Sequence, residues 1–316
     1  MGEWGTSMRF LVTGGAGFLG AALANRLVAE GHAVRVLDDL SSGDRSRLDQ
    51  RVAFTAGDIR DVPKLWSLLH GVDFVYHLAA RVSVPESVLY PVEYNAINVG
   101  GTVSLLTAMR DAQIKRLVFA SSGAVYGEQP SQPLTEELMP HPATPYAVSK
   151  RASELYVQAI GQLWGIETVI LRIFNAYGPG QPLPPSHPPV VPHYLRQALT
   201  GASVVIHGDG RQTRDFVFIS DVADALVAAA QAVGVDREIL NIGSGVETSV
   251  GGLADTIAKV LGKELHRLGN GDAAAGVSRM VADVGRAHEL LGYKPRVSLP
   301  EGLREILNSD ARFARR

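Results

Sequence analysis

Short apolar runs alternate with longer amphipathic stretches along the first 176 residues. The runs are rich in Val, Ile, Leu and Phe and are apolar throughout, as strands are in a parallel sheet that helices cover on both faces. The stretches between them repeat apolar positions every three or four residues, as helices do. The pattern predicts a doubly wound α/β fold. The predicted strands are residues 9–13, 33–38, 52–58, 73–80, 116–122 and 168–174, and the predicted helices are 18–30, 62–70, 95–112 and 146–163.

The alternation ends at residues 177–192, which hold seven prolines in 16 positions. Proline lacks a backbone donor and restricts the residue before it, so this segment is predicted to be an extended loop, neither helix nor strand. We expect residues 1–176 to form one domain and residues 177–316 a smaller α/β domain, with 236–243 as a candidate strand that returns to the first sheet. Further helices are predicted near 221–233, 250–261, 283–291 and 300–314.

Composition narrows the class of protein. Of the 316 residues, 46% are hydrophobic and 20% are charged, and the formal net charge is −2, which is typical of a globular protein without a polyanion-binding surface. We therefore expect no nucleic-acid partner. No apolar run reaches the roughly 18 to 20 residues of a membrane span, and no signal-peptide pattern is present, so we expect a cytoplasmic protein without a membrane partner. The absence of cysteine excludes disulfides and a thiolate nucleophile, and the nine histidines show no metal-ligand spacing.

A glycine-rich turn joins the first predicted strand to the first helix. In TGGAGFLG, residues 13–20, glycines stand at positions 14, 17 and 20. Gly14 and Gly17 allow a tight turn and a close approach of the backbone to a pyrophosphate, which would face amides and the positive end of the helix. Gly20 lets helix and strand pack closely. This layout predicts a Rossmann dinucleotide-binding domain.

The acidic residue at the end of the second strand bears on the choice of cofactor. Asp38 is suited to accept hydrogen bonds from the adenosine ribose hydroxyls, and its charge would repel a 2′-phosphate, so NAD is favoured over NADP. Arg45 and Arg47 follow closely in the sequence and weaken that argument. Asp58 ends another strand, where it is a candidate for the adenine amino group and equally for the cap of helix 62–70.

A tyrosine and a lysine stand four residues apart in TPYAVSK, residues 144–150. Thr144 is a good N-cap and Pro145 suits the first helical position, so a helix is predicted to begin here. The four-residue step places Tyr146 and Lys150 on one face of that helix. Such pairs are common on helix surfaces, so the spacing alone does not distinguish a catalytic pair from ordinary surface residues.

Motifs in a characteristic order extend over almost the whole chain: GGAGFLG, GDIRD, HLAA, NVGGT, SSGAVYG, YAVSK, LRIFNAYGPGQ and GDGRQTRDFVFISDVADA. Together they resemble the extended short-chain dehydrogenase/reductase family, and within it the branch that modifies NDP-sugars. The resemblance implies a catalytic set of Ser122, Tyr146 and Lys150. Lys150 would lower the phenol pKa of Tyr146, and Tyr146 would take a proton from a sugar hydroxyl while hydride leaves the same carbon for NAD⁺. Ser122 would hydrogen-bond the same oxygen.

The resemblance also implies two sets of binding residues. The NAD set is Gly14, Gly17, Phe18, Leu19, Asp38, Asp39, Ser42, Gly43, Asp58, Ile59, Leu78, Ala79, Ala80, Asn98, Tyr146, Lys150 and Phe174. The nucleotide-sugar set is Ser83, Ser122, Gly123, Ala124, Tyr146, Asn175, Val190, Ile206, His207, Arg214 and Met280.

The residues after Ser122 separate the chemistries of this branch. Similar sugar 4,6-dehydratases carry an Asp-Glu pair there, and UDP-glucuronate decarboxylases carry a glutamate, whereas this chain has Gly123 and Ala124. Neither side chain donates or accepts a proton, so elimination of water has no evident acid or base. The pattern resembles that of the 4-epimerases, in which C4 is oxidised and the same hydride returns to the other face.

Asn175 favours a neutral hexose as substrate. It matches an asparagine that contacts the diphosphate in UDP-hexose epimerases, whereas similar UDP-glucuronate 4-epimerases tend to have threonine there and an arginine shortly after. In this chain no arginine follows before Arg196, so a sugar carboxylate would lack an obvious fixed cation. A turn-forming residue at a strand end is the alternative interpretation of Asn175.

Arg214 and His207 are expected at the nucleotide. A guanidinium reaches two phosphate oxygens at once, so Arg214 is a candidate diphosphate clamp; a surface salt bridge with Asp215 is the alternative. His207 stands where relatives place an aromatic residue against the base. A histidine can stack on a base, but the sequence is equally compatible with an ordinary surface histidine.

One C-terminal segment departs from the relatives. Many of them have an Arg-Pro-Gly-Asp-like sequence that contacts phosphate and ribose, but this chain has Ala-Ala-Ala-Gly at residues 273–276, with Arg267 and Arg279 as the nearest cations. Either another arginine substitutes or nucleotide affinity is lower. Met280 stands where bulk limits acceptance of an N-acetyl group at C2, and methionine is intermediate in size and pliable.

These expectations combine into NAD-dependent 4-epimerisation of an NDP-sugar, foremost the interconversion of UDP-glucose and UDP-galactose. The alternatives are UDP-N-acetylglucosamine or UDP-glucuronate as substrate, a dehydratase or reductase on the same scaffold, and a non-catalytic NAD-sensing protein. The retained catalytic set argues against the last of these. Relatives usually dimerise through two helices that correspond to 95–112 and 146–163, so we expect a homodimer.

Overall fold

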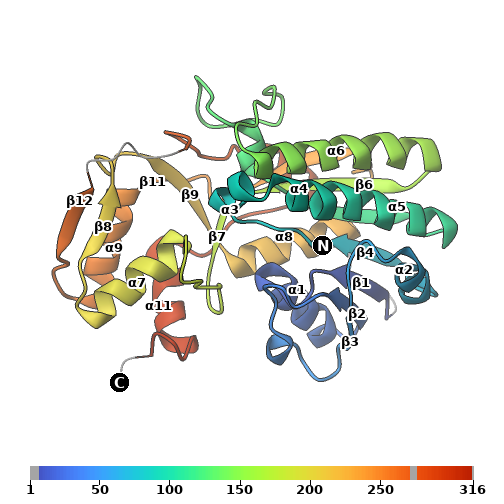
Figure 1. The fold of residues 1–316 in the computed structure, drawn as a ribbon, viewed down its shortest axis with the longest axis horizontal. Helices are drawn as coiled ribbons and strands as arrows, with labels where there is room; N and C mark the ends of the chain where they lie inside the picture. Colours follow the sequence, from blue (N-terminus) through green and yellow to red (C-terminus); the bar gives the residue numbers. More distant parts are fainter. Residues whose placement is uncertain (1–6, 271–275, 315–316) are drawn as a thin grey trace.

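A parallel sheet of seven strands is the centre of the computed structural model, which describes residues 7–270 and 276–314 (Figure 1). Its order is β10-β6-β5-β4-β1-β2-β3, and each neighbouring pair is parallel. The order reverses between β1 and β4, and open α/β sheets bind ligands at the carboxyl ends of strands at such a point. The predicted doubly wound α/β fold is confirmed. The strands are β1 (Arg9–Thr13), β2 (Ala33–Asp38), β3 (Ala53–Ala56), β4 (Phe74–His77), β5 (Arg116–Ser122), β6 (Glu167–Ile173) and β10 (Glu238–Ile242).

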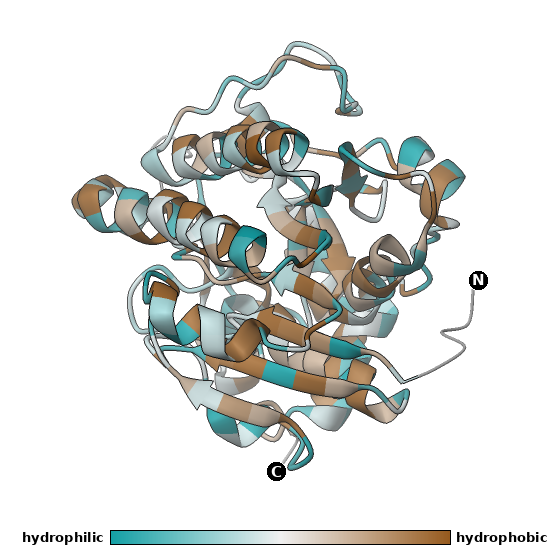
Figure 2. Ribbon diagram, turned by 90° about the vertical axis from the view of Figure 1, so that its right-hand side faces the viewer, coloured by the Kyte–Doolittle hydropathy of each residue, from teal (hydrophilic) through white to brown (hydrophobic). Residues whose placement is uncertain are grey.

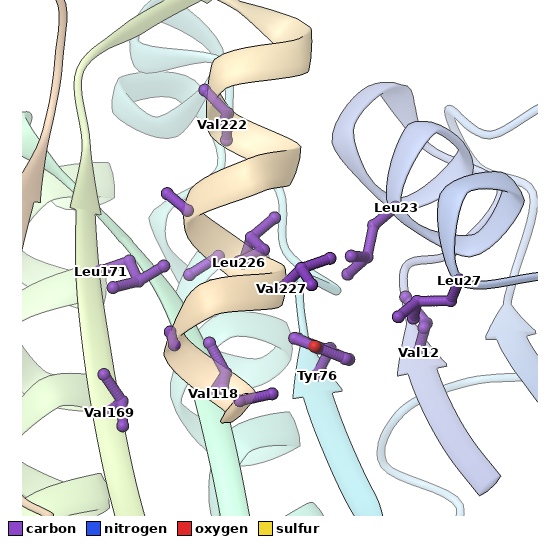
Figure 3. Packing of buried hydrophobic residues seen from close by; sticks show 14 of the residues in the cluster. Val12, Leu23, Leu27, Tyr76, Val118, Val169, Leu171, Val222, Leu226 and Val227 are labelled. Atoms are coloured by element: carbon purple, nitrogen blue, oxygen red, sulfur yellow. The ribbon is translucent and has the colours of Figure 1, made fainter. Parts of the chain in front are cut away.

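Helices cover both faces of this sheet. On one face, Leu23 and Leu27 of α1 and Leu226 of α8 are buried with Val12 and Tyr76 of the strands (Figure 3). On the other face, α2, α5 and α6 bury a second apolar cluster. Figure 2 shows hydrophobic residues concentrated along the central strands, while the helices carry both kinds of residue. The helices are α1 (Phe18–Ala29), α2 (Val62–Leu69), α5 (Gly101–Asp111), α6 (Pro145–Trp164), α8 (Ile219–Gln231) and α10 (Gly285–Leu291).

The C-terminal part has a separate apolar core. A three-stranded sheet, β11-β9-β7, and a two-stranded sheet, β12-β8, lie at the opposite end of the molecule from α2 and α5, beside three helices (Figure 1). The strands are β7 (Asn175–Tyr177), β8 (Val204–His207), β9 (Thr213–Phe218), β11 (Glu247–Ser249) and β12 (Arg267–Asn270). The helices are α7 (Val190–Thr200), α9 (Val250–Leu261) and α11 (Leu299–Ser309).

Two segments differ from the predicted pattern. The proline-rich segment is not a loop throughout, because α7 begins at Val190 with Pro189 as N-cap. Pro192 then lies in the first turn, where a backbone N–H has no helical partner. The helix predicted over 95–112 begins as a π-helix, Asn95–Gly100, preceded by α3 (Val84–Leu89) and α4 (Pro91–Tyr94).

The C-terminal half also contributes to the central sheet. β10 lies parallel to β6, with Glu238 opposite Val169, and α8 packs on the face that α1 covers. The division of the chain into domains at residue 176 stays a prediction.

The described residues include no helix long and apolar enough to cross a membrane. They also contain no group of three or more His, Asp or Glu side chains arranged to hold a metal ion.

Candidate active site

The glycine turn lies against the neighbouring strand at the point where the sheet order reverses. Gly14 has φ +69°, and a Cβ there would lie 2.6 Å from the amide nitrogen of Ala79, just beyond β4. A Cβ at Gly20 would collide with the carbonyl oxygen of Gly14. Gly17 is the N-cap of α1 and carries no side chain over the helix end. No side chain of the turn therefore covers the N-terminus of α1, where a pyrophosphate would bind.

Asp38 is held in place by the turn itself. Its carboxylate, 8% exposed, accepts hydrogen bonds from the backbone amides of Ala16 and Leu40, both at 2.9 Å. A Cβ at Gly43 would lie 2.7 Å from Asp38 Oδ1, so the loop after β2 folds back onto the turn. Each carboxylate oxygen retains acceptor capacity for a ribose hydroxyl.

The two arginines near Asp38 contact other groups. Arg45 lies over the ring of Phe54 at 5.1 Å, and Arg47 lies against Gly180, where a Cβ would be 2.6 Å from its Nη2. Within the described residues neither arginine forms an ion pair with Asp38. This leaves the carboxylate charge uncompensated by them, which is consistent with NAD.

Asp58 does not cap the following helix. Its carboxylate accepts hydrogen bonds from Arg60 Nε at 2.9 Å and Nη2 at 2.5 Å, while the cap of α2 is Asp61, which accepts from Lys64 N at 3.1 Å. The cap interpretation of Asp58 is therefore wrong, because Asp61 stands directly before the first helical turn. A contact of Asp58 with adenine stays a prediction.

Asn98 connects the segment after β4 with α6, the helix that carries Tyr146 and Lys150. Its amide donates to Arg81 O at 3.0 Å and to Ser149 Oγ at 2.9 Å, and its side-chain oxygen accepts from Arg81 N at 2.8 Å. The backbone after Leu78–Ala80 is thus tied to α6. Hydrogen bonds of Asn98 therefore connect two groups of predicted NAD residues, those after β4 and those on α6.

Ser122, Tyr146 and Lys150 meet at the carboxyl end of β5. Ser122 ends β5, and its Oγ accepts a hydrogen bond from Ala124 N at 3.2 Å. Tyr146 stands in the first turn of α6, is 8% exposed, and lies close enough to the Ser122 side chain for that hydroxyl to affect its pKa. Lys150, 4% exposed, donates from Nζ to Ala120 O at 2.8 Å.

Burial governs the titration of this group. It raises the pKa of Tyr146, and the Ser122 hydroxyl opposes the rise only in part. It also lowers the pKa of Lys150 to about 8, with the charge of Glu154 acting in the opposite direction. The downward shift of Tyr146 expected from the Tyr-Lys spacing is therefore not found in this structure, because the ammonium is directed to a carbonyl oxygen and burial dominates.

Gly123, Phe174 and Met280 come together beside this edge. A Cβ at Gly123 would lie 3.2 Å from the ring of Phe174, and Phe174 and Met280 share a buried apolar cluster with Val125 and Tyr126. A larger residue at position 123 would displace the ring. The position of the Phe174 ring in this cluster thus depends on glycine at position 123.

Arg214 and Asp215 do not form a salt bridge with each other. Arg214 Nη1 donates to Thr213 O at 2.7 Å and to Val277 O at 2.8 Å. Asp215 is fully buried on the other face of β9, where it accepts from Ser244 and from the amides of Gly245 and Ala282. The salt-bridge interpretation is wrong, since successive strand residues point to opposite faces.

The remaining predicted substrate residues are spread over several elements. Asn175 is the first residue of β7, opposite Phe216, rather than a turn residue. Ser83 caps α3, Val190 and Ile206 pack on the C-terminal core, and His207 is exposed at the end of β8.

The arginines nearest the missing clamp are already paired. Arg279 makes two hydrogen bonds to Glu247, at 2.7 and 2.8 Å, and Arg267 makes one to Asp255, at 2.7 Å. Residues 273–275 lie outside the described residues. Arg214, unlike Arg267 and Arg279, forms no ion pair with a carboxylate within the described residues.

Residues 10–243 match the NAD dependent epimerase/dehydratase family. The chain belongs to this family. The resemblance drawn from the sequence motifs is thereby confirmed, and so is NAD as the cofactor.

Several members of the family are similar over their whole length. The UDP-glucose 4-epimerase of Mycolicibacterium smegmatis is 40% identical over 308 residues, covering 94% of this chain and 96% of that protein. The crystal structure of UDP-glucose 4-epimerase from Thermotoga maritima with UDP-glucose has a TM-score of 0.91 at 34% identity and covers 95% of this chain and 98% of that one. The complex of the Thermus thermophilus UDP-glucose 4-epimerase with NAD has a TM-score of 0.88 at 34% identity, with the same coverage.

Three buried polar residues near the site were not predicted from the sequence. His77 lies at the end of β4, and Glu154 and Arg172 form an ion pair between α6 and β6. A signal for two of them was present: Arg172 interrupts an otherwise apolar predicted strand, and such a charge requires a buried partner. Glu154 stands four residues after Lys150, on the same helix face.

Proposed function

We propose that this chain is an NAD-dependent nucleotide-sugar 4-epimerase that interconverts UDP-glucose and UDP-galactose. The observation that carries the proposal is that Ser122 at the end of β5 and Tyr146 in the first turn of α6 lie together at the sheet edge, with Gly123 and Ala124 following Ser122. The pair supplies proton transfer at one sugar hydroxyl, and the two small residues supply no acid or base for elimination. The similarity to UDP-glucose 4-epimerases over the whole length supports the substrate.

The glycine turn and Asp38 would hold NAD. Without side chains, Gly14 and Gly17 would let the pyrophosphate approach the N-terminus of α1, and the fixed carboxylate of Asp38 would accept hydrogen bonds from the adenosine ribose. When bound, NAD supplies the acceptor, and later the donor, of the C4 hydride. A cofactor that is restored in each cycle needs no exchange with solvent, so tight binding is expected.

Tyr146 is the proposed acid and base. It would take the proton of the C4 hydroxyl and return it when the hydride comes back to the other face of the sugar. Ser122, which lies beside Tyr146, would hold the same oxygen. Because burial raises the Tyr146 pKa, deprotonation needs a nearby positive charge. We propose that Lys150, one turn further along α6, supplies it once substrate and cofactor are bound, although in this structure its ammonium donates to Ala120 O.

Arg214 is the proposed cation for the diphosphate. Its Nη1 is held by two carbonyl oxygens, which fix the plane of the guanidinium and leave its other nitrogens for phosphate oxygens. With Arg267 and Arg279 paired to carboxylates, we expect weaker nucleotide binding than in relatives that carry the full clamp.

Product analysis tests the proposed reaction. The purified protein is incubated separately with UDP-glucose, UDP-N-acetylglucosamine, UDP-glucuronate and dTDP-glucose, and the sugars are separated. Formation of UDP-galactose from UDP-glucose is expected, at a higher rate than any C4 epimer of the other substrates. A 4-keto-6-deoxy product from any of them would overturn the epimerase assignment.

The Tyr146→Phe variant tests the assigned acid and base. It removes only the hydroxyl, so the fold is expected to remain while turnover falls by about 10²- to 10⁴-fold. Tyr156→Phe, at an exposed position of the same helix, is the matched control and should retain turnover. Normal turnover of Tyr146→Phe would refute the role.

We also propose a homodimer formed through α5 and α6. The outer face of α6 carries Val148, Leu155 and Leu163, with 50%, 51% and 77% of their surface exposed. Their spacing of seven and eight residues makes an apolar stripe along a helix whose opposite face is buried. A second copy of the same surface would cover the stripe. The cytoplasm remains the proposed location on the grounds of sequence alone.

A further inference from the structure

A buried carboxylate lies one helical turn beyond Lys150. Glu154 has no exposed surface, and both of its oxygens accept hydrogen bonds. Oε1 accepts from Ser121 Oγ at 2.5 Å and from Arg172 Nε at 2.9 Å. Oε2 accepts from Arg172 Nη2 at 2.8 Å and from Arg151 Nη1 at 2.9 Å. The carboxylate thus joins three elements, β5, β6 and α6.

These contacts reach both sides of the proposed catalytic set. Ser121 directly precedes Ser122 at the end of β5. Glu154 follows Tyr146 and Lys150 at four-residue steps, so all three lie on one face of α6. The Ser121–Glu154 hydrogen bond therefore fixes the separation between the strand that carries Ser122 and the helix that carries Tyr146.

Stability alone is a weak reason for this ion pair. Burying Glu154 and Arg172 costs desolvation free energy that their attraction barely offsets, and apolar residues of similar volume often serve as well or better. Arg172 is 1% exposed, and its Nη1 has no hydrogen-bond partner in the described structure. Because this buried ion pair adds little stability and lies next to Ser122 and Lys150, we infer that it contributes to the reaction.

Glu154 is also the carboxylate that acts on Lys150. From β5, Lys150 contacts the Ala120 carbonyl and the ring of Phe119, whose centroid is 5.1 Å from Nζ. From β4 it faces His77, whose pKa is lowered to about 3, so that ring is neutral at physiological pH. The charge of Glu154 counteracts the effect of burial on Lys150.

Arg172 and Arg151 are the cations that face Glu154, and the network continues beyond Arg172. The guanidinium lies 4.7 Å from the ring centroid of Tyr126, whose hydroxyl donates to Asn241 Oδ1 at 2.7 Å. Asn241 N in turn donates to Glu136 Oε1 at 2.7 Å. Glu136 is thus a second carboxylate at the far end of the same chain of contacts, and it serves as a control.

We propose that Glu154 is a positioning residue of the epimerase, which sets the separation of Ser122 from Tyr146 and supplies the counter-charge of the buried Lys150. Its consequence for turnover rests on the proposed function. The effect on Lys150 does not depend on that function, so the two are tested separately.

The charge of Lys150 is followed directly by NMR titration of ¹³C- and ¹⁵N-labelled lysine side chains. The chain has only six lysines, and Lys150→Arg identifies the signal. In Glu154→Gln, loss of the negative charge should move the Lys150 midpoint to lower pH, whereas Glu136→Gln should leave it in place. An unchanged midpoint in Glu154→Gln would overturn the counter-charge.

Turnover then tests the positioning role. We expect Glu154→Gln to lower kcat by about 10²-fold, with a smaller change in KM and an alkaline limb moved to lower pH. Because this variant leaves Arg172 unpaired, the double variant Glu154→Gln/Arg172→Met removes the buried charge as well. It should recover thermal stability without recovering kcat.

Recovery of kcat in the double variant would show that Glu154 is only the structural partner of Arg172, and would refute the proposal. If the unaltered chain fails to epimerise any sugar, the proposed function falls, while the lysine titration still decides whether Glu154 is the counter-charge.

Discussion

His77 is a buried histidine that works as a neutral connector. Its Nδ1 lies 2.7 Å from Thr13 Oγ1 and its Nε2 lies 3.0 Å from Thr102 Oγ1, so the ring joins β1, β4 and α5. Burial, and then the charge of Lys150, lower its pKa to about 3. A second positive charge beside Lys150 is thereby avoided at physiological pH.

The low pKa of His77 predicts a loss of stability in acid. Above pH 6.5 the residue is neutral in both states, but between pH 6.5 and 3 the unfolded chain binds a proton that the folded chain does not. The free energy of unfolding should therefore fall by about 1.4 kcal/mol per pH unit on this account. Urea unfolding from pH 7 to 4 measures the slope, which should be shallower in His77→Gln and unchanged in the exposed control His70→Gln. Equal slopes in all three would contradict the assignment.

At single residues, the sequence was informative where a role needs one residue type. Positions 14 and 20 have no room for a Cβ, so glycine is required at both and the sequence pattern identifies them. Where neighbours compete for a role, the pattern was ambiguous: Asp61, not Asp58, caps α2. The choice depends on backbone geometry around the helix start, which the sequence does not show.

Among the elements, long periodic ones were predictable and short ones were not. The strands and helices of the first 176 residues carry their own pattern of buried positions, because each packs against a large sheet. β7 and β11 have three residues each, too few for a period, and they exist because β9 lies between them. Tertiary pairing, rather than local preference, decides such strands.

Two helices begin with the same kind of side-chain cap, but only α6 carries Tyr146 in its first turn. Thr144 accepts a hydrogen bond from Ala147 N at 3.2 Å, and Ser249 makes the same kind of cap for α9, accepting from Gly252 N at 2.9 Å. Each substitution by alanine should cost about 1 kcal/mol of unfolding free energy. Only Thr144→Ala should also lower kcat, because the turn it caps carries Tyr146. Denaturant unfolding and initial rates check both, and equal rates in the two variants would contradict a role of the cap in placing Tyr146.

In the whole molecule, segments far apart in sequence complete the site. Leu134 exchanges hydrogen bonds of 2.8 Å with Val281 and Asp283, and Ser278 N donates to Glu128 at 2.7 Å. These contacts hold the segment of Met280 against the loop that follows Ser122. Neither segment has a periodic pattern, so their pairing could not be predicted from the sequence. Ser122 and Met280 themselves were predicted as site residues.

The exposed apolar stripe on α6 predicts that the chain forms a dimer. Charged residues introduced into this stripe should dissociate that dimer. Placing lysines at Leu155 and Leu163 would bury four unpaired ammonium groups in the interface, two from each protomer, which is unfavourable without partners. Light scattering during gel filtration should give a dimer for the unaltered chain and a monomer for Leu155→Lys/Leu163→Lys. Val233→Lys, at a position 95% exposed and distant from this helix in sequence, should remain dimeric. A double variant that is still dimeric would show that the interface lies elsewhere. Tyr146 and Lys150 lie on the buried face of the same helix. A folded monomer that keeps its turnover would therefore show that packing against the chain's own sheet is enough to hold α6 in place.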